Sequence, residues 1–360
     1  MKNTLPKTEP SPEDREKLLR AAPLLQAWFE ENARPLPWRG ERDPYRIWVS
    51  ETMLQQTRIE AVLGYYPRFM EAFPTLSALA EAPEERVLKL WEGLGYYSRA
   101  RNLHKAARMC AEQYGGALPR TAAELKKLPG VGAYTAGAVA SLAFGEAVPA
   151  VDGNVLRILA RLLNDERDVL QPAVKREAEA LLREVLEQQE RPGLFNEALM
   201  ELGEVVCLPN GDPRCRRCPL REICGALAVG TEKDLPNRGE ARPRRVEEKT
   251  VLLLRSGGRI ALEKRPDKGL LAGLYGFPML DGTLEKTDIL PWLKSFGIPF
   301  RDLRTTGQAK HIFTHVEWRM TAWEAETETA LPGYIYADKE ELETRYALPA
   351  AFKAFRDRWE

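Results

Sequence analysis

The chain contains few cysteines and histidines and has no excess of charge of either sign. Its 360 residues include 5 cysteines and 3 histidines, and 53 basic residues are balanced by 53 acidic ones, giving zero net charge. Without a basic excess, any affinity for nucleic acid must come from local patches rather than bulk charge. No run of residues is apolar enough for a membrane span. With 44% hydrophobic and 29% charged residues, we expect a globular protein that is not embedded in a membrane.

The first residues also lack the apolar stretch of a secretory signal. The segment MKNTLPKTEPSPEDREK is polar and charged, so we expect a cytoplasmic protein. In a reducing compartment its cysteines are thiols or metal ligands rather than disulfides.

The chain is too long for one compact core, and its texture changes part-way along. Over residues 1–230 apolar side chains recur at three- and four-residue spacing between short Gly and Pro turns, which predicts a nearly all-α domain. Residues 231–245 (TEKDLPNRGEARPRR) are polar, charged and proline-containing, so they predict a linker between domains.

Residues 246–360 carry strand patterns. Lys249–Leu254 and Arg259–Lys264 flank Ser256-Gly257-Gly258, which predicts a β-hairpin. Residues 311–323 (HIFTHVEWRMTAW) alternate with period two, and helical patterns occur near 287–296 and 338–357. We therefore predict an α+β domain whose helices pack on a sheet.

Four of the five cysteines form a cluster with the pattern C-x7-C-x2-C-x5-C. Zinc sites usually present two closely spaced cysteine pairs and this pattern has one, whereas iron–sulfur clusters accept irregular spacing. The spacing therefore favours iron–sulfur over zinc and leaves both open. The isolated Cys110, in ARMCAEQY, is expected to be a small buried hydrophobe. The clustered residues are Cys207, Cys215, Cys218 and Cys224.

A local basic patch is interleaved with these cysteines. Such a run of charge is ordinarily a solvated face, but a loop cross-linked by a cluster would hold it rigidly toward a phosphate backbone. It consists of Arg214, Arg216, Arg217 and Arg221.

Residues 121–144 predict two helices joined by a tight turn. Pro129 ends the first helix, while Gly130 and Gly132 permit the turn and leave the amides of the second helix open to a phosphate. Asp152, in VDGNV, precedes another amphipathic helix, where an aspartate is ordinarily an N-cap.

The hairpin, Asp152 and the four cysteines follow one another in an order that resembles the helix-hairpin-helix glycosylases of the endonuclease III superfamily. Three further stretches look like the MutY family of adenine glycosylases: RPLPWR at 34–39, WVSETMLQQT at 48–57 and GLGYYSR at 93–99. The resemblance covers almost the whole chain. It implies an all-α helix-hairpin-helix glycosylase domain with an iron–sulfur loop at 207–224, followed by an α+β Nudix-like domain at 246–360.

The resemblance also implies a function. The enzyme would remove adenine mispaired with 8-oxoguanine or guanine from double-stranded DNA in base excision repair, after flipping the adenine out of the duplex. It implies a [4Fe-4S] cluster on the four clustered cysteines. We expect a nucleoid-associated monomer.

The expected chemistry uses two carboxyl groups. Adenine leaves poorly until it is protonated, so Glu51, in the apolar run WVSETML, is the candidate acid; without the resemblance it would be an ordinary solvated helix glutamate. Asp152 would stabilise the oxocarbenium-like sugar or trap it covalently. In this superfamily a lysine two residues past the last hairpin glycine marks enzymes that form a Schiff base. Here that residue is Tyr134, which predicts water as the nucleophile and no efficient strand cleavage.

Further roles are implied by the resemblance alone. Tyr134 would hydrogen-bond in the site and Asn154 would support Asp152. Gln56 and Tyr96 would fill the duplex once the base has left it; without the resemblance, Tyr96 would be a core aromatic. Contacts with the adenine pocket or the DNA are implied for Leu36, Trp38, Arg39, Gly130, Gly132 and Glu197.

The C-terminal domain begins like a Nudix fold, but the expected glutamate-rich magnesium helix is replaced by DILPWLKSFGI. We therefore expect a recognition module rather than a pyrophosphohydrolase. The resemblance places the 8-oxoguanine contact at Phe313, Thr314 and His315, where relatives commonly have Phe-Ser-His. Threonine keeps the hydroxyl and adds a methyl group. The first cysteine gap is likewise one residue longer than usual, which predicts a bulged loop with all four ligands retained.

Two other functions compete with this hypothesis. The first is a monofunctional glycosylase of the same fold that acts on thymine mismatches, and Glu51 and the C-terminal domain count against it. The second is a catalytically silent mismatch-binding protein, which would not need Glu51 and Asp152.

Overall fold

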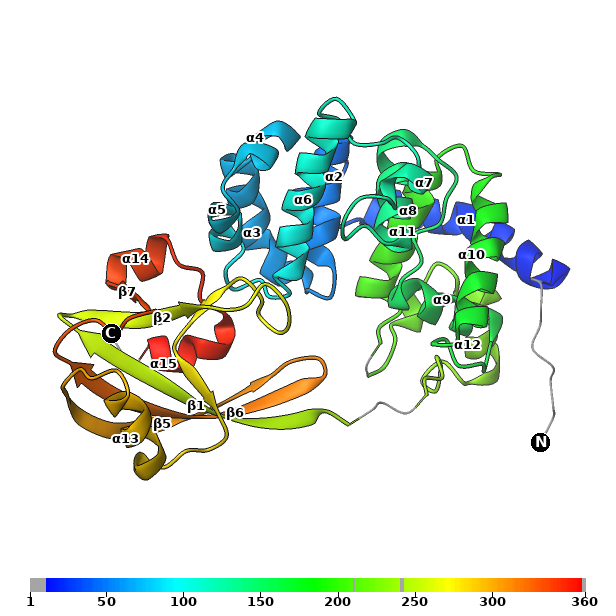
Figure 1. The fold of residues 1–360 in the computed structure, drawn as a ribbon. Coiled ribbons are helices and arrows are strands. Elements are labelled where there is room, and N and C mark those ends of the chain that lie inside the picture. Colours follow the sequence, from blue (N-terminus) through cyan, green and yellow to red (C-terminus); the bar gives the residue numbers. More distant parts are fainter. Residues whose placement is uncertain (1–10, 210, 240–242, 358–360) are drawn as a thin grey trace. The chain divides into compact units, whose positions relative to one another are not determined.

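The computed structural model describes residues 11–209, 211–239 and 243–357 (Figure 1). The chain forms two compact units: Met1–Ala80 with Lys105–Glu240, and Glu81–His104 with Ala241–Glu360. Across the described ranges, no helix has the length and apolar character needed to cross a membrane.

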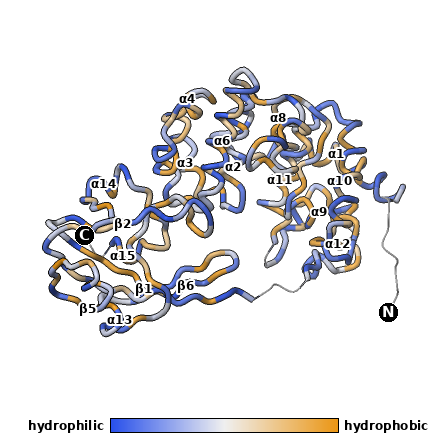
Figure 2. The backbone as a smooth tube through the Cα atoms, in the orientation of Figure 1, coloured by the Kyte–Doolittle hydropathy of each residue, from blue (hydrophilic) through white to orange (hydrophobic). Residues whose placement is uncertain are grey.

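The described residues before 240 form helices and turns, as the spacing of apolar residues predicted. Figure 2 shows hydrophobic stretches alternating with hydrophilic ones along these helices. The α-helices are α1 Pro12–Asn32, α2 Pro44–Leu54, α3 Ile59–Ala72, α4 Leu76–Glu81, α5 Glu84–Leu90, α6 Ser98–Gln113, α7 Ala122–Leu125, α8 Ala133–Phe144, α9 Gly153–Leu163, α10 Pro172–Leu186, α11 Pro192–Val205 and α12 Gly225–Val229. Two 3-10 turns lie at Cys215–Arg217 and Arg221–Ile223.

One apolar cluster of the first unit is built mainly by α1, α9, α10 and α11. Leu25, Val185 and Phe195 are fully buried there. Gly203 on α11 permits a close approach to α9, because a Cβ atom at this position would lie 2.8 Å from the Cβ of Asn154. The packing of α11 on α9 thus fixes the first turn of α9, where Asp152 and Asn154 lie.

The predicted hairpin at 121–144 is present as α7 and α8. Thr121 caps α7 by accepting a hydrogen bond from the Glu124 amide. Gly130 has φ 76°, a conformation that glycine adopts without strain. Gly132 is the N-cap of α8 and, as a glycine, has no side chain with which to cap the first amides of this helix.

The predicted linker at 231–245 is largely folded. Leu235 is 3% exposed, and its carbonyl accepts a hydrogen bond from Arg161 Nε at 2.9 Å. The Val169 amide donates to the Asn237 carbonyl at 3.1 Å. The buried Leu235 side chain and the paired carbonyls of Leu235 and Asn237 thus attach this polar segment to the first unit. At its other end the first strand already begins at Arg245, and residues 240–242 lie outside the described residues.

The second unit is built on a mixed seven-stranded sheet with the order β3-β2-β1-β6-β5, in which β4 pairs with β1 and β7 with β2. β1 and β6 run parallel and the other pairs are antiparallel. The strands are β1 Arg245–Ser256, β2 Arg259–Lys264, β3 Tyr275–Gly276, β4 Met279–Asp281, β5 Phe300–Ile312, β6 Val316–Thr327 and β7 Ile335–Ala337.

Strand β1 is covered on both faces. Val251 and Leu253 belong to one apolar cluster, while Leu252 and Leu254 belong to the other. Alternating side chains of a strand point to opposite faces, so a run of leucines marks a strand inside two layers. Helices α13 Lys286–Lys294, α14 Lys339–Thr344 and α15 Lys353–Arg356 contribute to these layers.

The β1–β2 hairpin is confirmed, with Gly257 and Gly258 at φ 56° and 75°, and α13 matches the pattern near 287–296. Two other expectations were wrong. The strand expected over 311–323 is interrupted by a reversal at 313–315, closed by a hydrogen bond from the Phe313 amide to the Val316 carbonyl. The helix expected over 338–357 is split, because Pro349 lies between α14 and the final turns.

Residues 81–104 belong with the sheet rather than with the helical domain to which the sequence assigned them. The Tyr275 hydroxyl donates to Glu85 Oε1 at 2.8 Å, and the Leu348 amide donates to Glu92 Oε1 at 3.0 Å. These polar contacts join positions far apart in sequence, so helical periodicity could not reveal them.

Candidate active site

Glu51 lies on the buried face of α2. Asp43 caps this helix, and every residue from Ile47 to Met53 is buried. The Glu51 side chain is 6% exposed, and its Oε2 has no hydrogen-bond partner among the described residues. Burial raises the pKa of Glu51 from 4.5 to about 7. The sequence hypothesis of a carboxyl group that keeps a proton near neutral pH therefore agrees with its surroundings.

Four neighbouring groups modify this effect of burial. The negative charges of Glu197 and Asp152 raise the pKa of Glu51 further, while the Tyr134 phenol and the Arg39 guanidinium lower it. The two carboxyl groups predicted to share the chemistry are thus electrostatically coupled.

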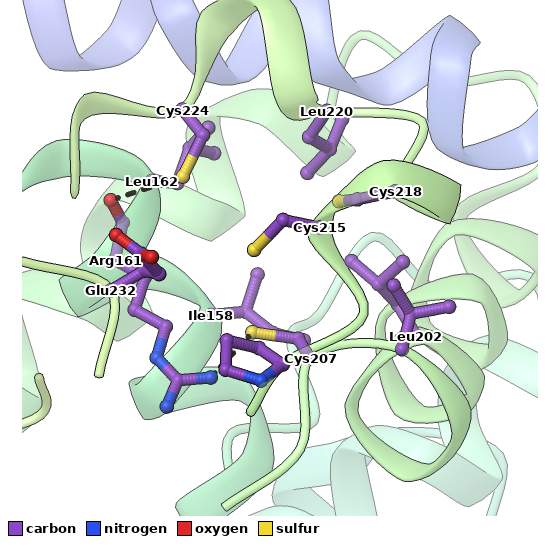
Figure 3. Close-up of a pocket in the computed structure, with 12 residues that line it drawn as sticks. Ile158, Arg161, Leu162, Leu202, Cys207, Cys215, Cys218, Leu220, Cys224 and Glu232 are labelled. Atoms are coloured by element: carbon purple, nitrogen blue, oxygen red, sulfur yellow. Dashed lines mark hydrogen bonds between the residues drawn. The ribbon is translucent and has the colours of Figure 1, made fainter. Parts of the chain in front are cut away.

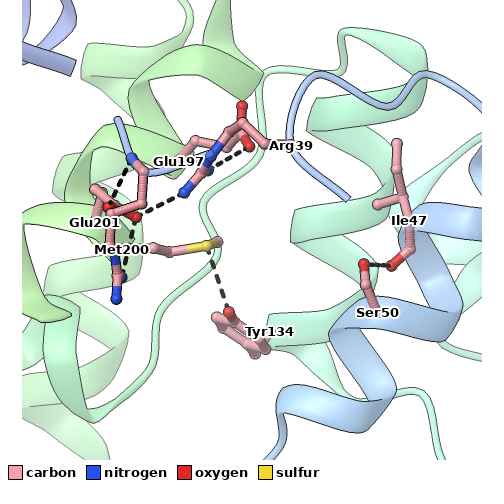
Figure 4. Close-up of polar contacts among 8 residues, drawn as sticks. Arg39, Ile47, Ser50, Tyr134, Glu197, Met200 and Glu201 are labelled. Carbon is pink, nitrogen blue, oxygen red and sulfur yellow. Dashed lines mark hydrogen bonds and ion pairs between the residues drawn. The ribbon is translucent and has the colours of Figure 1, made fainter. Parts of the chain in front are cut away.

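Tyr134 lies in the first turn of α8, directly after the hairpin glycines. Burial, followed by the charges of Glu51 and Asp152, raises the pKa of its phenol well above the usual value. Its hydroxyl donates to the Met200 Sδ atom at 3.5 Å (Figure 4). The side chain at this position is therefore a neutral phenol that faces the carboxyl pair.

Asp152 is the N-cap of α9. Its Oδ1 accepts hydrogen bonds from the amides of Asn154 and Val155 at 2.8 and 2.9 Å, and its Oδ2 accepts from Asn154 Nδ2 at 3.1 Å. Burial raises the pKa of Asp152, and the two amides oppose this rise. The capping role and the chemical role proposed from the sequence are therefore compatible, because the cap orients the carboxylate.

A second row of contacts holds Asn154 in place. Its Oδ1 accepts a hydrogen bond from Arg157 NH2 at 2.9 Å, and Arg157 Nε donates to the Cys207 carbonyl at 2.8 Å. Arg157 is 2% exposed. A continuous set of hydrogen bonds thus runs from Asp152 to the backbone of the first clustered cysteine.

Arg39 is held between two carboxylates of α11, as Figure 4 shows. It contacts Glu197 Oε1 at 2.7 Å and Glu201 Oε2 at 2.6 Å, and Arg34 Nε contacts Glu201 Oε1 at 2.6 Å. Glu201 is 2% exposed. Arg39 and Glu197 were predicted from the sequence as site residues, whereas Arg34 and Glu201 were not. The i,i+4 spacing of the two glutamates in FNEALMELG, which places them on one helix face, was the available signal.

The other predicted DNA contacts occupy contrasting environments. Trp38 is 8% exposed and packs against Tyr66, with ring centroids 5.4 Å apart, while Leu36 is half-buried. Gln56 and Tyr96 are exposed and have φ values of 54° and 46°. Residues other than glycine rarely adopt this left-handed conformation, and it is concentrated at functional sites.

The four clustered cysteines line a single pocket of the first unit (Figure 3). Arg161 NH1 donates to Cys207 Sγ at 3.2 Å. Burial raises the pKa of Cys218 to about 12 and also raises the pKa of Cys215 and Cys224. Within the described ranges no three Cys, His, Asp or Glu side chains are grouped closely enough to hold one metal ion. The lone Cys110 is fully buried in α6, as predicted.

The second unit contains a larger pocket of about 680 Å³ beside the β5–β6 turn. The Tyr96 and Thr314 hydroxyls meet there at 3.3 Å. The Phe313 ring packs edge-on against His311 and Trp318, with centroids 4.6 and 5.0 Å apart. Cationic side chains outnumber acidic ones in the lining, which includes Arg101, Arg245, Lys249, Arg265, Glu247 and His315.

Comparisons with known proteins agree with both units. Residues 49–188 match the HhH-GPD superfamily of base excision DNA repair proteins, and residues 250–358 match the NUDIX domain family. The human adenine DNA glycosylase is 36% identical over 92% of this chain and 72% of its own length. The mouse adenine DNA glycosylase is 35% identical over 92% of this chain and 76% of its own length.

The chain belongs to the adenine DNA glycosylase family. It is therefore a DNA glycosylase of base excision repair, as the sequence predicted. The helical part also resembles the solved structure of a thermostable thymine-DNA glycosylase, at 28% identity with a TM-score of 0.53, over 60% of this chain and 98% of that one. Because the adenine DNA glycosylases match over 92% of the chain, the alternative of a thymine-specific enzyme is disfavoured.

Replacing the candidate acid of this adenine DNA glycosylase with Glu51→Gln is expected to change how stability depends on pH. Because the pKa of Glu51 is raised, the contribution of this residue to the free energy of unfolding is fully present below about pH 4.5 and is lost as the pH rises through about 7. The rise from 4.5 to about 7 corresponds to roughly 3 kcal/mol. Urea unfolding between pH 4 and 9 should therefore show the variant gaining about that much relative to wild type. Glu71→Gln, on the exposed side of α3, is the control, and parallel curves for Glu51→Gln and wild type would contradict the assignment.

Proposed function

We propose that this glycosylase hydrolyses the N-glycosidic bond of adenine paired with 8-oxoguanine, or with guanine, and leaves the DNA strand uncut. The observation that carries the proposal is the pairing of a buried Glu51 carboxyl, with a pKa of about 7, with the capped Asp152 carboxylate. Their environments differ, and carboxyl groups in unequal environments divide into acid and charge-stabilising partners.

Glu51 acts first. An acid whose pKa lies near the working pH is both protonated and able to give up its proton. Glu51 donates to a ring nitrogen of the flipped adenine, the bond from the sugar carbon to adenine breaks, and its electron pair leaves with the base. Adenine thereby departs as a neutral molecule rather than as an anion.

Asp152 then faces a sugar that has become positively charged. Two amide hydrogen bonds and Asn154 already fix the direction of its carboxylate, so little reorganisation is needed when the charge develops. Water adds to the sugar carbon and releases one proton to a carboxylate, which leaves an abasic sugar and an intact strand.

Tyr134 supports hydrolysis rather than strand cleavage. A phenol cannot form an imine with the sugar, and its high pKa keeps it neutral. Its place between the carboxyl groups and Met200 suits a hydrogen-bond donor that orients Glu51 or the water molecule.

The base opposite adenine is contacted by the second unit in this proposal. Thr314 and His315 lie at an exposed turn that borders a pocket with a cationic lining. Hydroxyl and imidazole groups can bond the edge of a damaged purine, and the cations suit the flanking phosphates. Gln56 and Tyr96, held in left-handed conformations, would fill the space that the flipped adenine leaves.

We also propose that the four cysteines hold a [4Fe-4S] cluster. The donor set fits, because buried thiols with raised pKa values ionise only beside a strong positive charge. The bound cluster would supply a structural cross-link for a loop of two short turns. The exposed arginines 214, 216, 217 and 221 would then face the DNA backbone from a fixed surface.

The proposal is tested by single-turnover excision from duplexes that place adenine opposite 8-oxoguanine, guanine, cytosine or thymine. Adenine release opposite 8-oxoguanine and guanine, with no strand nick and little borohydride-trapped adduct, is expected. A protein that binds these duplexes and releases no adenine would be a silent binder. Abundant trapping would show covalent imine chemistry instead.

Asp152→Asn is expected to lower the excision rate by about a thousandfold or more, because the charge that stabilises the sugar is lost. Asparagine is also a good N-cap, so α9 and duplex binding should be preserved, as circular dichroism and fluorescence anisotropy can verify. Asp43→Asn makes the same change at the N-cap of α2 and serves as the control. An equal loss of binding and excision at Asp152 would show that this residue is a structural cap only.

The purified protein is expected to be brown, with a broad absorbance near roughly 400 nm, as thiolate-bound iron–sulfur clusters are. Cys218→Ser should remove this band, and Cys110→Ala should keep it because Cys110 lies alone in α6. A colourless protein that contains stoichiometric zinc would refute the proposed cluster.

A further inference from the structure

A small group of charged side chains anchors α5 within the second unit. Lys89 Nζ donates to the carbonyls of Leu342 and Tyr346 at 2.8 and 3.2 Å and forms an ion pair with Glu92. Glu92 Oε1 accepts from the Leu348 amide at 3.0 Å and pairs with Arg356 NH1 at 3.3 Å. We call Lys89, Glu92 and Arg356 the α5 clamp.

The α5 clamp is largely shielded from solvent. The side chains of Lys89, Glu92 and Arg356 are 14%, 16% and 26% exposed. Hydrogen bonds between partly buried charged groups and backbone atoms are stronger and more geometrically specific than ion pairs on the surface. The α5 clamp therefore fixes the position of α5 on the segment that precedes the last helix of the chain.

The loop that follows α5 is held by its own contacts. Trp91 is fully buried, and its Nε1 donates to the Gly95 carbonyl at 3.0 Å. The Gly93 amide donates to the Tyr97 hydroxyl at 3.1 Å. Arg99 donates to the carbonyls of Leu94 and Gly95 at 3.3 and 3.1 Å. A displacement at Glu92 is thus transmitted along a loop with little freedom to absorb it.

Tyr96 is at the exposed end of this loop. It is 47% exposed and has φ 46°, a conformation that persists only where neighbouring contacts impose it. The Arg99 guanidinium lies 5.4 Å from the Tyr96 ring and 5.3 Å from the Trp91 ring. On its other side, the Tyr96 hydroxyl meets Thr314 Oγ1 at 3.3 Å.

We propose that the α5 clamp is a positioning device for recognition of the base opposite adenine. Lys89 and Glu92 act through the loop to hold Tyr96 against Thr314, so that the side chain that fills the duplex and the one that contacts the opposite base share one rigid frame. This inference rests on the proposed function of the second unit. Neither Lys89 nor Glu92 needs to touch DNA.

Removing a side chain of the α5 clamp is therefore expected to impair recognition of the base opposite adenine and to leave the chemical step intact. The acid and the sugar-stabilising carboxylate lie in the first unit, outside the α5 clamp and its loop. Misplacing Tyr96 relative to Thr314 weakens contacts that distinguish 8-oxoguanine from guanine and leaves the chemical groups unchanged. Excision opposite 8-oxoguanine should therefore fall toward the rate observed opposite guanine.

The test measures single-turnover rate constants on duplexes with adenine opposite 8-oxoguanine and opposite guanine. Lys89→Met keeps the apolar stem and removes the donors, so the ratio of the two rate constants is expected to fall about tenfold, within the usual range of coupling between sites. Lys89→Arg, which keeps a charged donor, should restore most of the ratio. Arg255→Met removes an ion pair with Glu324 on the central strands, where Arg255 is 33% and Glu324 is 13% exposed, and should leave the ratio unchanged.

The ratio separates positioning from stability, because an inactive fraction of protein affects the amplitude on both duplexes and not the relative rate constants. Glu92→Gln and Arg356→Met provide the same test if Lys89→Met does not fold. A wild-type ratio that persists in folded variants of the α5 clamp overturns the inference while the proposed function stands. If the wild-type enzyme has equal rate constants on the two duplexes, the proposed specificity is wrong, and the inference that rests on it is wrong as well.

Discussion

The chemistry proposed for this glycosylase depends on carboxyl groups placed where water cannot fully solvate their charge. Glu51 is buried on α2, and burial is the largest cause of the rise in its pKa to about 7. Glu51 lies on an apolar α2 that packs on α8, and α8 in turn packs on α11. The Arg39 guanidinium opposes the rise in pKa, and Gly203 lets α11 approach Asn154 beside Asp152. The helical unit thus holds the two candidate carboxyl groups, Glu51 and Asp152, in different environments.

Much of the fold could be predicted from the sequence because local patterns determine it. The 3.6-residue periodicity revealed the helices, the glycines at 257 and 258 revealed a hairpin, and VDGNV revealed the cap of α9. The turn at 313–315 could not be predicted, because its residues are ordinary strand formers and the reversal depends on pairing between β5 and β6. The burial of Leu235 could not be predicted either, because a single leucine in a polar segment does not form a periodic apolar pattern.

At the candidate site, Glu51, Asp152 and Tyr134 were proposed from the resemblance to a known family, and residues of these types suit the chemistry of adenine release. Partners that act by packing or by balancing charge were missed. Glu201 and Arg34 became visible only when α11 brought the glutamate beside Arg39. Arg157 contacts Asn154, three residues away, and also the backbone at Cys207, fifty residues along the chain. A single sequence contains no information on the second contact.

Because residues 81–104 group with the C-terminal sheet, the two units cannot be obtained as separate fragments by cutting the chain once. The backbone leaves the first unit, passes through the second, returns, and leaves again near residue 240. A single cut at the apparent boundary therefore does not yield two intact halves: the N-terminal fragment would retain α5 without the partners of Lys89 and Glu92. The two units are interleaved along the chain, so the residues that build the sheet unit come from two separate stretches of sequence.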